Sequence, residues 1–364
     1  MRRRLLLIVS VPLLIAAAMS ANALDSLKTG KAELQSAGPL AFGPDGILFA
    51  GDSKGARIFA LDTNDRSGTK QAALPDLKGI GEKIAALVGA AADQILVHDL
   101  AVNPLSKASY LSVSRGRGPD AIPLIVRVDA SGKLTELRLD NIRHSSIELP
   151  DAPSPQAVDR RGQSQRMEAI TDLAWVDGRV IVAGLSNEEF SSKLRAVPFP
   201  FREVSSGTSV EIYHGSHGRF ETNSPVRTFV PHRIDGDPHI LAAYTCTPLV
   251  KIPLSSLKPG AKVTATTIAE LGNRNRPLDM VVYRKDGKDF ILMNNSSRGV
   301  MKVPADKLGT FPAITEQTDV KGVPYETLAQ FKGVEQLDSY DDAHAVMLVR
   351  SESGSLDLKS VAFP

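Results

Sequence analysis

Residues 213–222 read YHGSHGRFET, which places His214 and His217 three positions apart with glycines around them. Imidazole nitrogens at this spacing can reach one Zn²⁺ or Cu²⁺ ion. Cys246, the only cysteine, and His98 are candidate third and fourth ligands. Cys246 is also a candidate ligand-binding residue or nucleophile, since a thiolate is reactive beside a basic group. The alternative is a glycine-rich loop with locally bonded histidines and an inert, buried cysteine.

Four aspartates form a second candidate site, because each opens a short apolar segment: Asp99, Asp172, Asp279 and Asp338. Carboxylate oxygens suit Ca²⁺ or Mg²⁺. The alternative is that each carboxylate bonds the backbone of a neighbouring element and locks the fold. If the four gather in one place they repel one another unless they are paired or metallated, which favours a metal site for the set.

Polar turn and loop residues supply a predicted ligand-binding set, which consists of Arg115, Asn187, Cys246, Arg274, Asn294 and Arg298. Guanidinium groups pair with carboxylates through two parallel hydrogen bonds. The arginines therefore either neutralise the aspartates or bind an anionic ligand. The elements that carry these residues decide whether any of them meet.

Those elements form a repeat. An apolar strand, a turn, a second apolar strand, a polar turn and a third strand recur six times, beginning at 39–51, 98–113, 171–184, 228–244, 278–294 and 337–349. This pattern predicts an all-β fold, a six-bladed β-propeller of four-stranded blades. A seven-bladed ring and a β-sandwich are the alternatives. Residues 80–92 have apolar residues at helical spacing and predict a helix between blades.

The sixth copy ends at the chain terminus after three strands, so its outer strand must come from elsewhere. We predict that residues 31–35 supply it and close the ring. In a propeller, the inner strand begins on the face that carries the turn between the second and third strands. The strand-opening aspartates and the polar turns are therefore predicted to share one face, at the mouth of the central channel.

The segments PLAFGPDGILFAGD and ITDLAW resemble blades of the broad six-bladed propeller group that includes the NHL-repeat and SMP-30/gluconolactonase-like proteins. The SMP-30-like proteins hold a catalytic divalent ion at the channel mouth with carboxylates and Asn amides. The resemblance implies Asp99, Asp172, Asn187 and Asp279 as counterparts by position. The group hosts lactonases, lyases, dehydrogenases and binding modules, so the resemblance implies no single activity.

The N-terminus has the three parts of a signal peptide: Arg2 to Arg4, an apolar run at 5–18, and the small residues Ala21 and Ala23. We predict cleavage after Ala23, export to the periplasm or the medium, and a single domain over 24–364, monomeric and without a membrane span. A retained anchor is the alternative. Cleavage removes three of the 43 Lys and Arg and none of the 41 Asp and Glu, and this near-neutral balance excludes a nucleic-acid partner.

No CxxCH haem motif and no nicotinamide-binding glycine run is present. The sequence thus predicts an exported propeller that binds a small ligand or a divalent metal (Ca, Zn or Cu) at the channel mouth of one face. A divalent-metal hydrolase of the lactonase type or a lyase at the same site is one alternative. A protein–protein interaction scaffold is the other.

Overall fold

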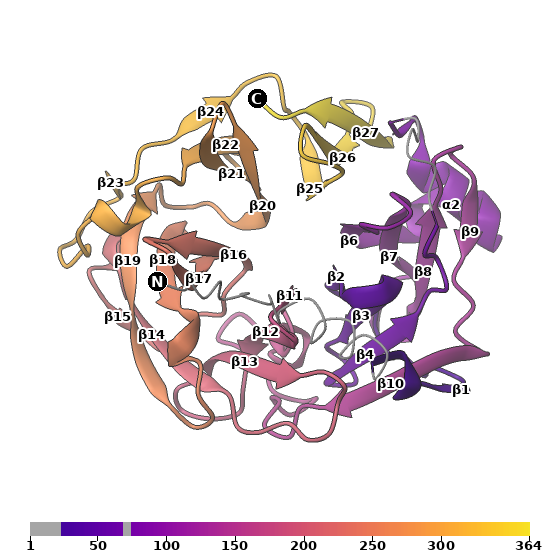
Figure 1. Cartoon of the computed structure of the whole chain (residues 1–364), viewed down its shortest axis with the longest axis horizontal. Coiled ribbons are helices and arrows are strands. Elements are labelled where there is room, and N and C mark those ends of the chain that lie inside the picture. Colours follow the sequence, from indigo (N-terminus) through magenta and orange to yellow (C-terminus); the bar gives the residue numbers. More distant parts are fainter. Residues whose placement is uncertain (1–22, 68–73) are drawn as a thin grey trace, which may run out of the picture.

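The computed structural model describes residues 23–67 and 74–364. The predicted signal peptide, apart from Ala23, lies outside these ranges. Among the described residues, none of the helices has both the length and the apolar character needed to cross a membrane. The chain is almost entirely β-strand, and the strands stand radially around a central channel, which confirms the β-propeller prediction (Figure 1).

The described residues form six four-stranded blades, which we name after their innermost strands. The first three are β2 (Leu40–Phe42), β3 (Ile47–Asp52), β4 (Arg57–Asp62) and β10 (Ile142–Glu148); β6 (Ile95–Val102), β7 (Ser109–Arg115), β8 (Ile122–Val128) and β9 (Leu134–Glu136); and β11 (Asp172–Val176), β12 (Arg179–Leu185), β13 (Ser192–Pro198) and β14 (Thr208–His214).

The other three blades follow in the C-terminal half. They are β16 (Thr228–Ile234), β17 (Asp237–Ala243), β18 (Pro248–Pro253) and β19 (Lys262–Leu271); β20 (Pro277–Lys285), β21 (Lys288–Asn295), β22 (Gly299–Pro304) and β24 (Glu326–Leu328); and β25 (Val334–Ser339), β26 (His344–Arg350), β27 (Leu356–Ala362) and β5 (Asp76–Leu77). Three short strands extend blade edges: β1 (Lys28–Gly30), β15 (Arg219–Glu221) and β23 (Val320–Gly322). The outer strands β14 and β19 also pair in parallel and join two blades.

Helical segments are short. The α-helix α2 spans Ile80–Val88. The 3₁₀ turns are η1 (Pro44–Gly46), η2 (Ala92–Gln94), η3 (Gly118–Asp120), η4 (Arg166–Glu168), η5 (Gly215–His217), η6 (Leu254–Ser256) and η7 (Leu308–Thr310).

The blades do not follow the chain order around the ring. Contacts between inner strands run in the cycle β11, β16, β20, β25, β6, β2 and back to β11. The β6 blade, second along the sequence, thus lies between the last blade and the first, as Figure 1 shows. The repeat pattern does not reveal this order, because it describes each blade and not its neighbours.

The predicted closure by residues 31–35 is wrong. The fourth strand of the last blade is β5, where Leu77 pairs with Leu358. Backbone N–H groups of Gln35 and Ser36 instead donate to the Asp52 carboxylate at 2.8 Å, which holds that segment against the β2 blade. The N-terminal strand β1 pairs with β10 on the edge of the same blade. Closure therefore comes from a strand that lies between β4 and α2 along the chain.

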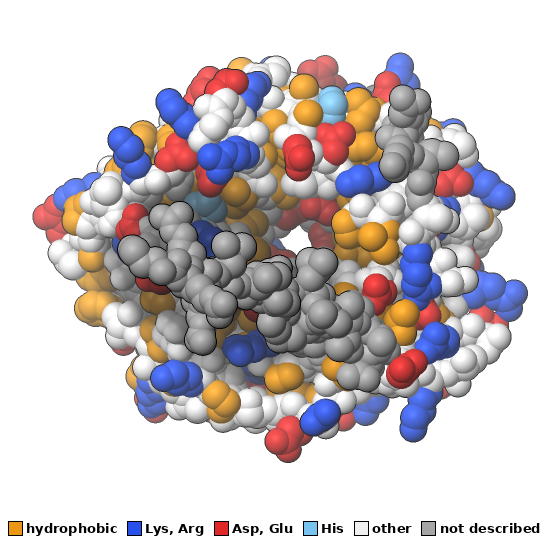
Figure 2. Space-filling model, viewed as in Figure 1, with side chains coloured by type: hydrophobic (Ala, Val, Ile, Leu, Met, Phe, Trp, Pro, Cys, Tyr) orange, Lys and Arg blue, Asp and Glu red, His pale blue; other side chains and the backbone are white. Residues whose placement is uncertain are grey.

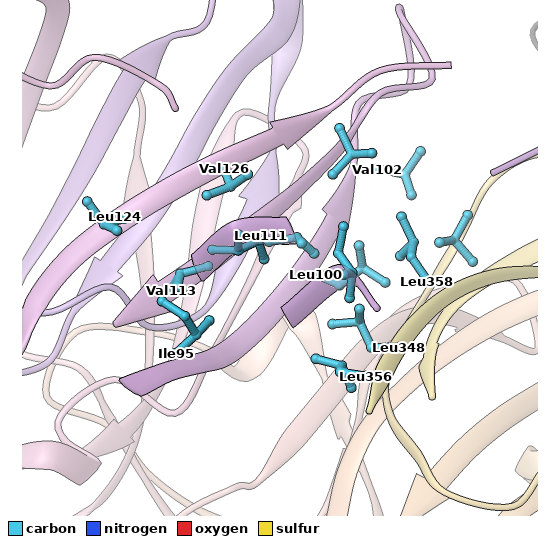
Figure 3. Close-up of a cluster of buried hydrophobic side chains, with 14 of the residues drawn as sticks. Ile95, Leu100, Val102, Leu111, Val113, Leu124, Val126, Leu348, Leu356 and Leu358 are labelled. Atoms are coloured by element: carbon cyan, nitrogen blue, oxygen red, sulfur yellow. The ribbon is translucent and has the colours of Figure 1, made fainter. Parts of the chain in front are cut away.

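The core lies between blades, so strands are apolar on both faces. Four consecutive residues of β3, Ile47 to Ala50, are fully buried. The predicted helix is confirmed in α2, whose Ile80 and Ile84 are buried in the cluster that joins the β6 and β25 blades. Figure 3 shows side chains of these two blades, including Leu100 and Leu348, meeting in that cluster. This packing fixes the inner strands that carry the candidate sites.

Candidate functional site

Of the four aspartates predicted to open strands, only Asp172 does so, because Asp99 lies in the middle of β6, Asp279 is the third residue of β20 and Asp338 precedes the last residue of β25. Each of the four accepts two backbone hydrogen bonds, one from its own strand and one from the next blade. In Asp172, Oδ1 accepts from Leu173 N and Oδ2 accepts from Phe229 N of the β16 blade, both at 2.7 Å. The same pattern occurs at Asp99 (Leu100 and Leu40), Asp279 (Met280 and Leu337) and Asp338 (Ser339 and Val102). We call these contacts the aspartate latches. They join four of the neighbouring blade pairs.

Enclosure in the channel raises the pKa of all four carboxyl groups. Burial raises the pKa of Asp172 to about 7 and that of Asp338 to about 6. The pKa values of Asp99 and Asp279 also lie well above their ordinary value, because burial is reinforced by neighbouring carboxyl groups. Figure 2 shows acidic side chains on the wall of the central opening.

These contacts favour the alternative in which the aspartates lock neighbouring blades, and a cation site at the aspartate ring stays a prediction. Their oxygens are directed at backbone N–H groups. Within the described residues, a single group of three His, Cys, Asp or Glu residues offers ligand atoms within 4.8 Å of one another, and it contains none of these aspartates. The alternative drawn from the sequence, an Asp that locks neighbouring blades, is what the structure shows.

A cavity of about 760 Å³ opens above the aspartates on the face where the inner strands begin, and we call it the funnel. Asp99, Asp172 and Asp279 line both the funnel and a second cavity of about 940 Å³ beneath it, so they form the neck between the two. Asp338 lines only the lower cavity. The strand register is interrupted beside His98 and Leu278, and both side chains line the funnel. A β-bulge redirects side chains in this way.

None of the residues predicted to bind a ligand lines the funnel. These residues are Arg115, Asn187, Cys246, Arg274, Asn294 and Arg298. The Arg115 guanidinium donates to Val88 O at 3.0 Å, and that of Arg298 donates to Asn273 O at 3.1 Å. Asn294 is fully buried. The side chains of Arg115, Asn294 and Arg298 therefore make local contacts away from the funnel.

The funnel wall carries other cations, namely Lys54, Arg117, Arg166, Arg227 and Arg276. The sequence analysis did not assign Arg227 to the site. It lies one residue before β16, and its guanidinium pairs with Glu168 and donates to Thr245 Oγ1 at 3.1 Å. A signal existed, because Arg227 directly precedes the strand-opening residue Thr228.

The predicted His214, His217 and Cys246 cluster does come together. One ligand atom from each residue lies within 4.8 Å of the others, and the two imidazole rings lie 3.8 Å apart. β14 ends at His214, η5 carries His217, and Cys246 lies in the turn between β17 and β18. His98 is not part of the cluster, because it lies in the β6 blade, where its Nε2 bonds Ser114 Oγ at 2.7 Å.

Glu221 orients both histidines. Its Oε2 bonds His214 Nδ1 at 2.9 Å and its Oε1 bonds His217 Nδ1 at 2.7 Å. Burial raises the pKa of Glu221, but hydrogen bonds from His214, Ser224 and His217 outweigh it and leave the pKa well below its ordinary value. A carboxylate that holds Nδ1–H leaves Nε2 free to bind a metal. Glu221 was missed by the sequence analysis, although it follows His217 by four residues.

The cluster grades from buried to exposed. The His214 side chain is 2 % exposed, and its Nε2 is buried without a hydrogen-bond partner. The His217 side chain is 42 % exposed, and Cys246 is half-buried. A buried imidazole nitrogen without a partner is costly unless something binds it. The three side chains therefore form a candidate metal site that is buried at His214 and reaches solvent at His217.

A buried acid lies beneath the histidine loop. Glu270 Oε1 accepts from Gly215 N at 2.6 Å, and burial raises the pKa of Glu270 to about 8. A side chain at Gly215 would lie 2.7 Å from Glu270 Cγ. Glycine at this position therefore lets η5 approach β19, which positions His214 and His217 on either side of it.

Comparisons with known proteins identify no family: no family model matches the chain, and no curated protein matches it. Three solved structures align over most of it. An oxidoreductase described as a glucose dehydrogenase from Thermus thermophilus is 13 % identical, with 92 % of this chain and 100 % of that chain covered and a TM-score of 0.35.

The other two alignments are similar in extent. The PQQ-bound aldose sugar dehydrogenase of Streptomyces coelicolor is 11 % identical (92 % and 97 % covered, TM-score 0.31). A Trichoderma reesei carbohydrate-active enzyme of family AA12 is 10 % identical (93 % and 96 % covered, TM-score 0.33). At these scores no activity is carried over. The comparisons give no support to the narrower NHL-repeat or SMP-30-like resemblance, nor to a hydrolase, and the β-propeller fold rests on the strand topology.

Proposed function

We propose that this protein is an exported β-propeller that binds one transition-metal ion through His214, His217 and Cys246. Two observations carry the proposal: His214, His217 and Cys246 each offer one ligand atom within 4.8 Å of the others, and the Nε2 of His214 is buried without a hydrogen-bond partner. Two imidazoles and a thiolate suit Zn²⁺ or copper, whereas Ca²⁺ prefers oxygen ligands. Of the metals considered from the sequence, the ligand set therefore favours Zn and Cu over Ca.

Three protein ligands leave room for a fourth, which at zinc sites with an open position is water or a bound molecule. The exposure of His217 puts that position on the solvent side. An open position is also what a metal-dependent hydrolase or lyase requires, so the enzyme alternatives depend on this same site. A scaffold protein would have no use for it.

The test is metal analysis of the purified mature protein. We expect about one equivalent of Zn²⁺ or copper per chain, which His214→Ala and Cys246→Ala abolish. His239→Ala is the matched control, because its Nδ1 bonds Asp237 O in a hairpin of the neighbouring blade. Asp172→Ala must keep the metal, since the aspartate latch is structural.

A wild-type protein that binds no metal after dialysis against Zn²⁺ or Cu²⁺, and whose melting temperature is unchanged by chelator, would overturn the proposal. Metal lost from Asp172→Ala but kept by His214→Ala would move the site to the channel. Cobalt substitution adds a readout of the thiolate, because a Cys–Co²⁺ charge-transfer band requires Cys246 as a ligand.

A further inference from the structure

The funnel carries cations that the metal site does not use. Arg276 is exposed and lines the funnel, and among the described residues its guanidinium has no hydrogen-bond or ion-pair partner. Arg227 lies close to it. Burial lowers the pKa of Arg227, the Glu168 carboxylate opposes this effect, and the positive charge of Arg276 lowers the pKa further. Two like charges facing one cavity repel unless an anion lies between them.

Arg166 adds a third guanidinium. Its Nε donates to Lys54 O at 3.1 Å and its Nη1 to Pro153 O at 2.9 Å. These bonds to backbone carbonyls fix the side chain without neutralising its charge, because neither partner is a carboxylate. The guanidinium is thus held in the funnel wall as a fixed cation.

Among the described residues, the acidic groups of the funnel leave Arg276 and Arg166 without a carboxylate partner. Glu168 pairs with Arg227. Burial raises the pKa of Asp172 to about 7, and burial together with neighbouring carboxyl groups raises the pKa values of Asp99 and Asp279. Enclosure in the neck therefore disfavours negative charge on these three carboxyl groups.

The funnel wall also carries apolar side chains beside its charged and polar ones. Leu96, Met167 and Leu278 line the funnel, and Met167 is 50 % exposed. A volume of about 760 Å³ is in the range of sites for small organic molecules. A bound inorganic ion would leave these apolar side chains exposed to water.

We infer that the funnel binds a small organic anion, whose carboxylate or phosphate lies between Arg227 and Arg276 and whose apolar body contacts Met167 and Leu278. Guanidinium forks match both head groups through paired hydrogen bonds. The inference does not rest on the metal site, since none of the three metal-binding side chains lines the funnel.

The test is calorimetric titration of the mature protein with benzoate and with phenyl phosphate, each compared with acetate and inorganic phosphate. We expect at least one aromatic anion to bind more tightly than its small counterpart, and whichever binds identifies the head group. Arg276→Gln weakens that binding by about tenfold, the value of one charge-assisted hydrogen bond. Arg166→Gln weakens it by a similar factor.

Arg179→Gln is the matched control. Arg179 is exposed and, among the described residues, has no ion pair. It lies beside the hairpin turn between β11 and β12, at the end of these strands opposite the funnel. Equal affinities for wild type, Arg276→Gln and Arg166→Gln would overturn the inference, as would the absence of binding by both aromatic anions. Repeating the titration after chelator treatment separates the two proposals. Anion affinity that is unchanged when the metal is removed shows that the funnel site does not depend on the metal. If the protein binds no metal at all, the comparison of anion affinities still tests the funnel.

Discussion

The aspartate latches predict a defined cost for Asp172→Asn at mildly acidic pH. Asp172 accepts from Leu173 N and Phe229 N at 2.7 Å with its two different oxygens. At pH 5, below its pKa of about 7, the carboxyl group is protonated, but both oxygens still have lone pairs. The Asn amide nitrogen has none, so one buried N–H loses its acceptor. Such a loss costs about 1–3 kcal/mol.

The stability cost of Asp172→Asn depends on pH in a definite direction. Because folding raises the pKa of Asp172 from 3.8 to about 7, the folded state binds the proton more tightly than the unfolded state. The wild type therefore loses stability as the pH rises from about 4 through 7. Asn does not titrate, so the stability difference between wild type and Asp172→Asn is largest near pH 4, shrinks as the pH rises to about 7, and is constant above that.

The assay is urea unfolding followed by the fluorescence of Trp175, the only tryptophan, which lies on the same strand β11 and stacks on Phe49. Asp120→Asn, at an exposed aspartate, is the control. A loss at pH 5 below about 0.5 kcal/mol, no greater than that of an ordinary surface change, would refute the latch. A stability loss that grows as the pH rises from 5 to 7 would refute the assignment of a raised pKa.

The same geometry supports three more tests. Glu221→Gln removes the carboxylate that bonds the Nδ1 atoms of His214 and His217. We therefore expect zinc affinity, measured by competition with a chelator, to fall by about 10- to 100-fold. An unchanged melting temperature of the apo protein is the control. The urea midpoint of the wild type is higher at pH 5 than at pH 8, because Asp172 and Asp338 both have raised pKa values; a midpoint that rises with pH would contradict this. Gly184→Ala lowers the melting temperature, since its Cβ would lie 2.1 Å from Ala169 O; the control Gly236→Ala, with no atom near its Cβ but a positive φ, shows the effect of backbone strain alone.

The fold was predictable to the level of the blade, because a blade is encoded locally. Alternating apolar strands and polar turns indicated the strand-opening positions, and Asp172 does open β11. The order of blades around the ring is not local. It depends on β5 and β10, which leave their sequence neighbours to complete distant blades. Two paired residues in β5 are too few to give a strand pattern in the sequence.

The candidate site was predictable where backbone position alone decides it. His214, His217 and Cys246 meet because their turns converge on one face. The predicted ligand-binding set does not line the funnel, because a residue's place at a strand end does not fix where a long side chain points, as Arg115 shows by turning to Val88 O. The aspartates were placed correctly in the ring, but their role depended on which blade stands beside each one.

The metal site and the funnel are lined by different side chains, yet they share one hairpin turn. Thr245 Oγ1 accepts from Arg227 of the funnel, and the next residue, Cys246, offers its thiol to the histidines. Cys246 N donates to Asn275 O at 2.6 Å, directly before Arg276. The turn that positions the thiol therefore also bonds the side chain of Arg227 and the backbone directly before Arg276, the two arginines of the proposed anion site. This shared turn is the physical reason why the proposed metal ligands and the proposed anion site lie on the same face of the ring.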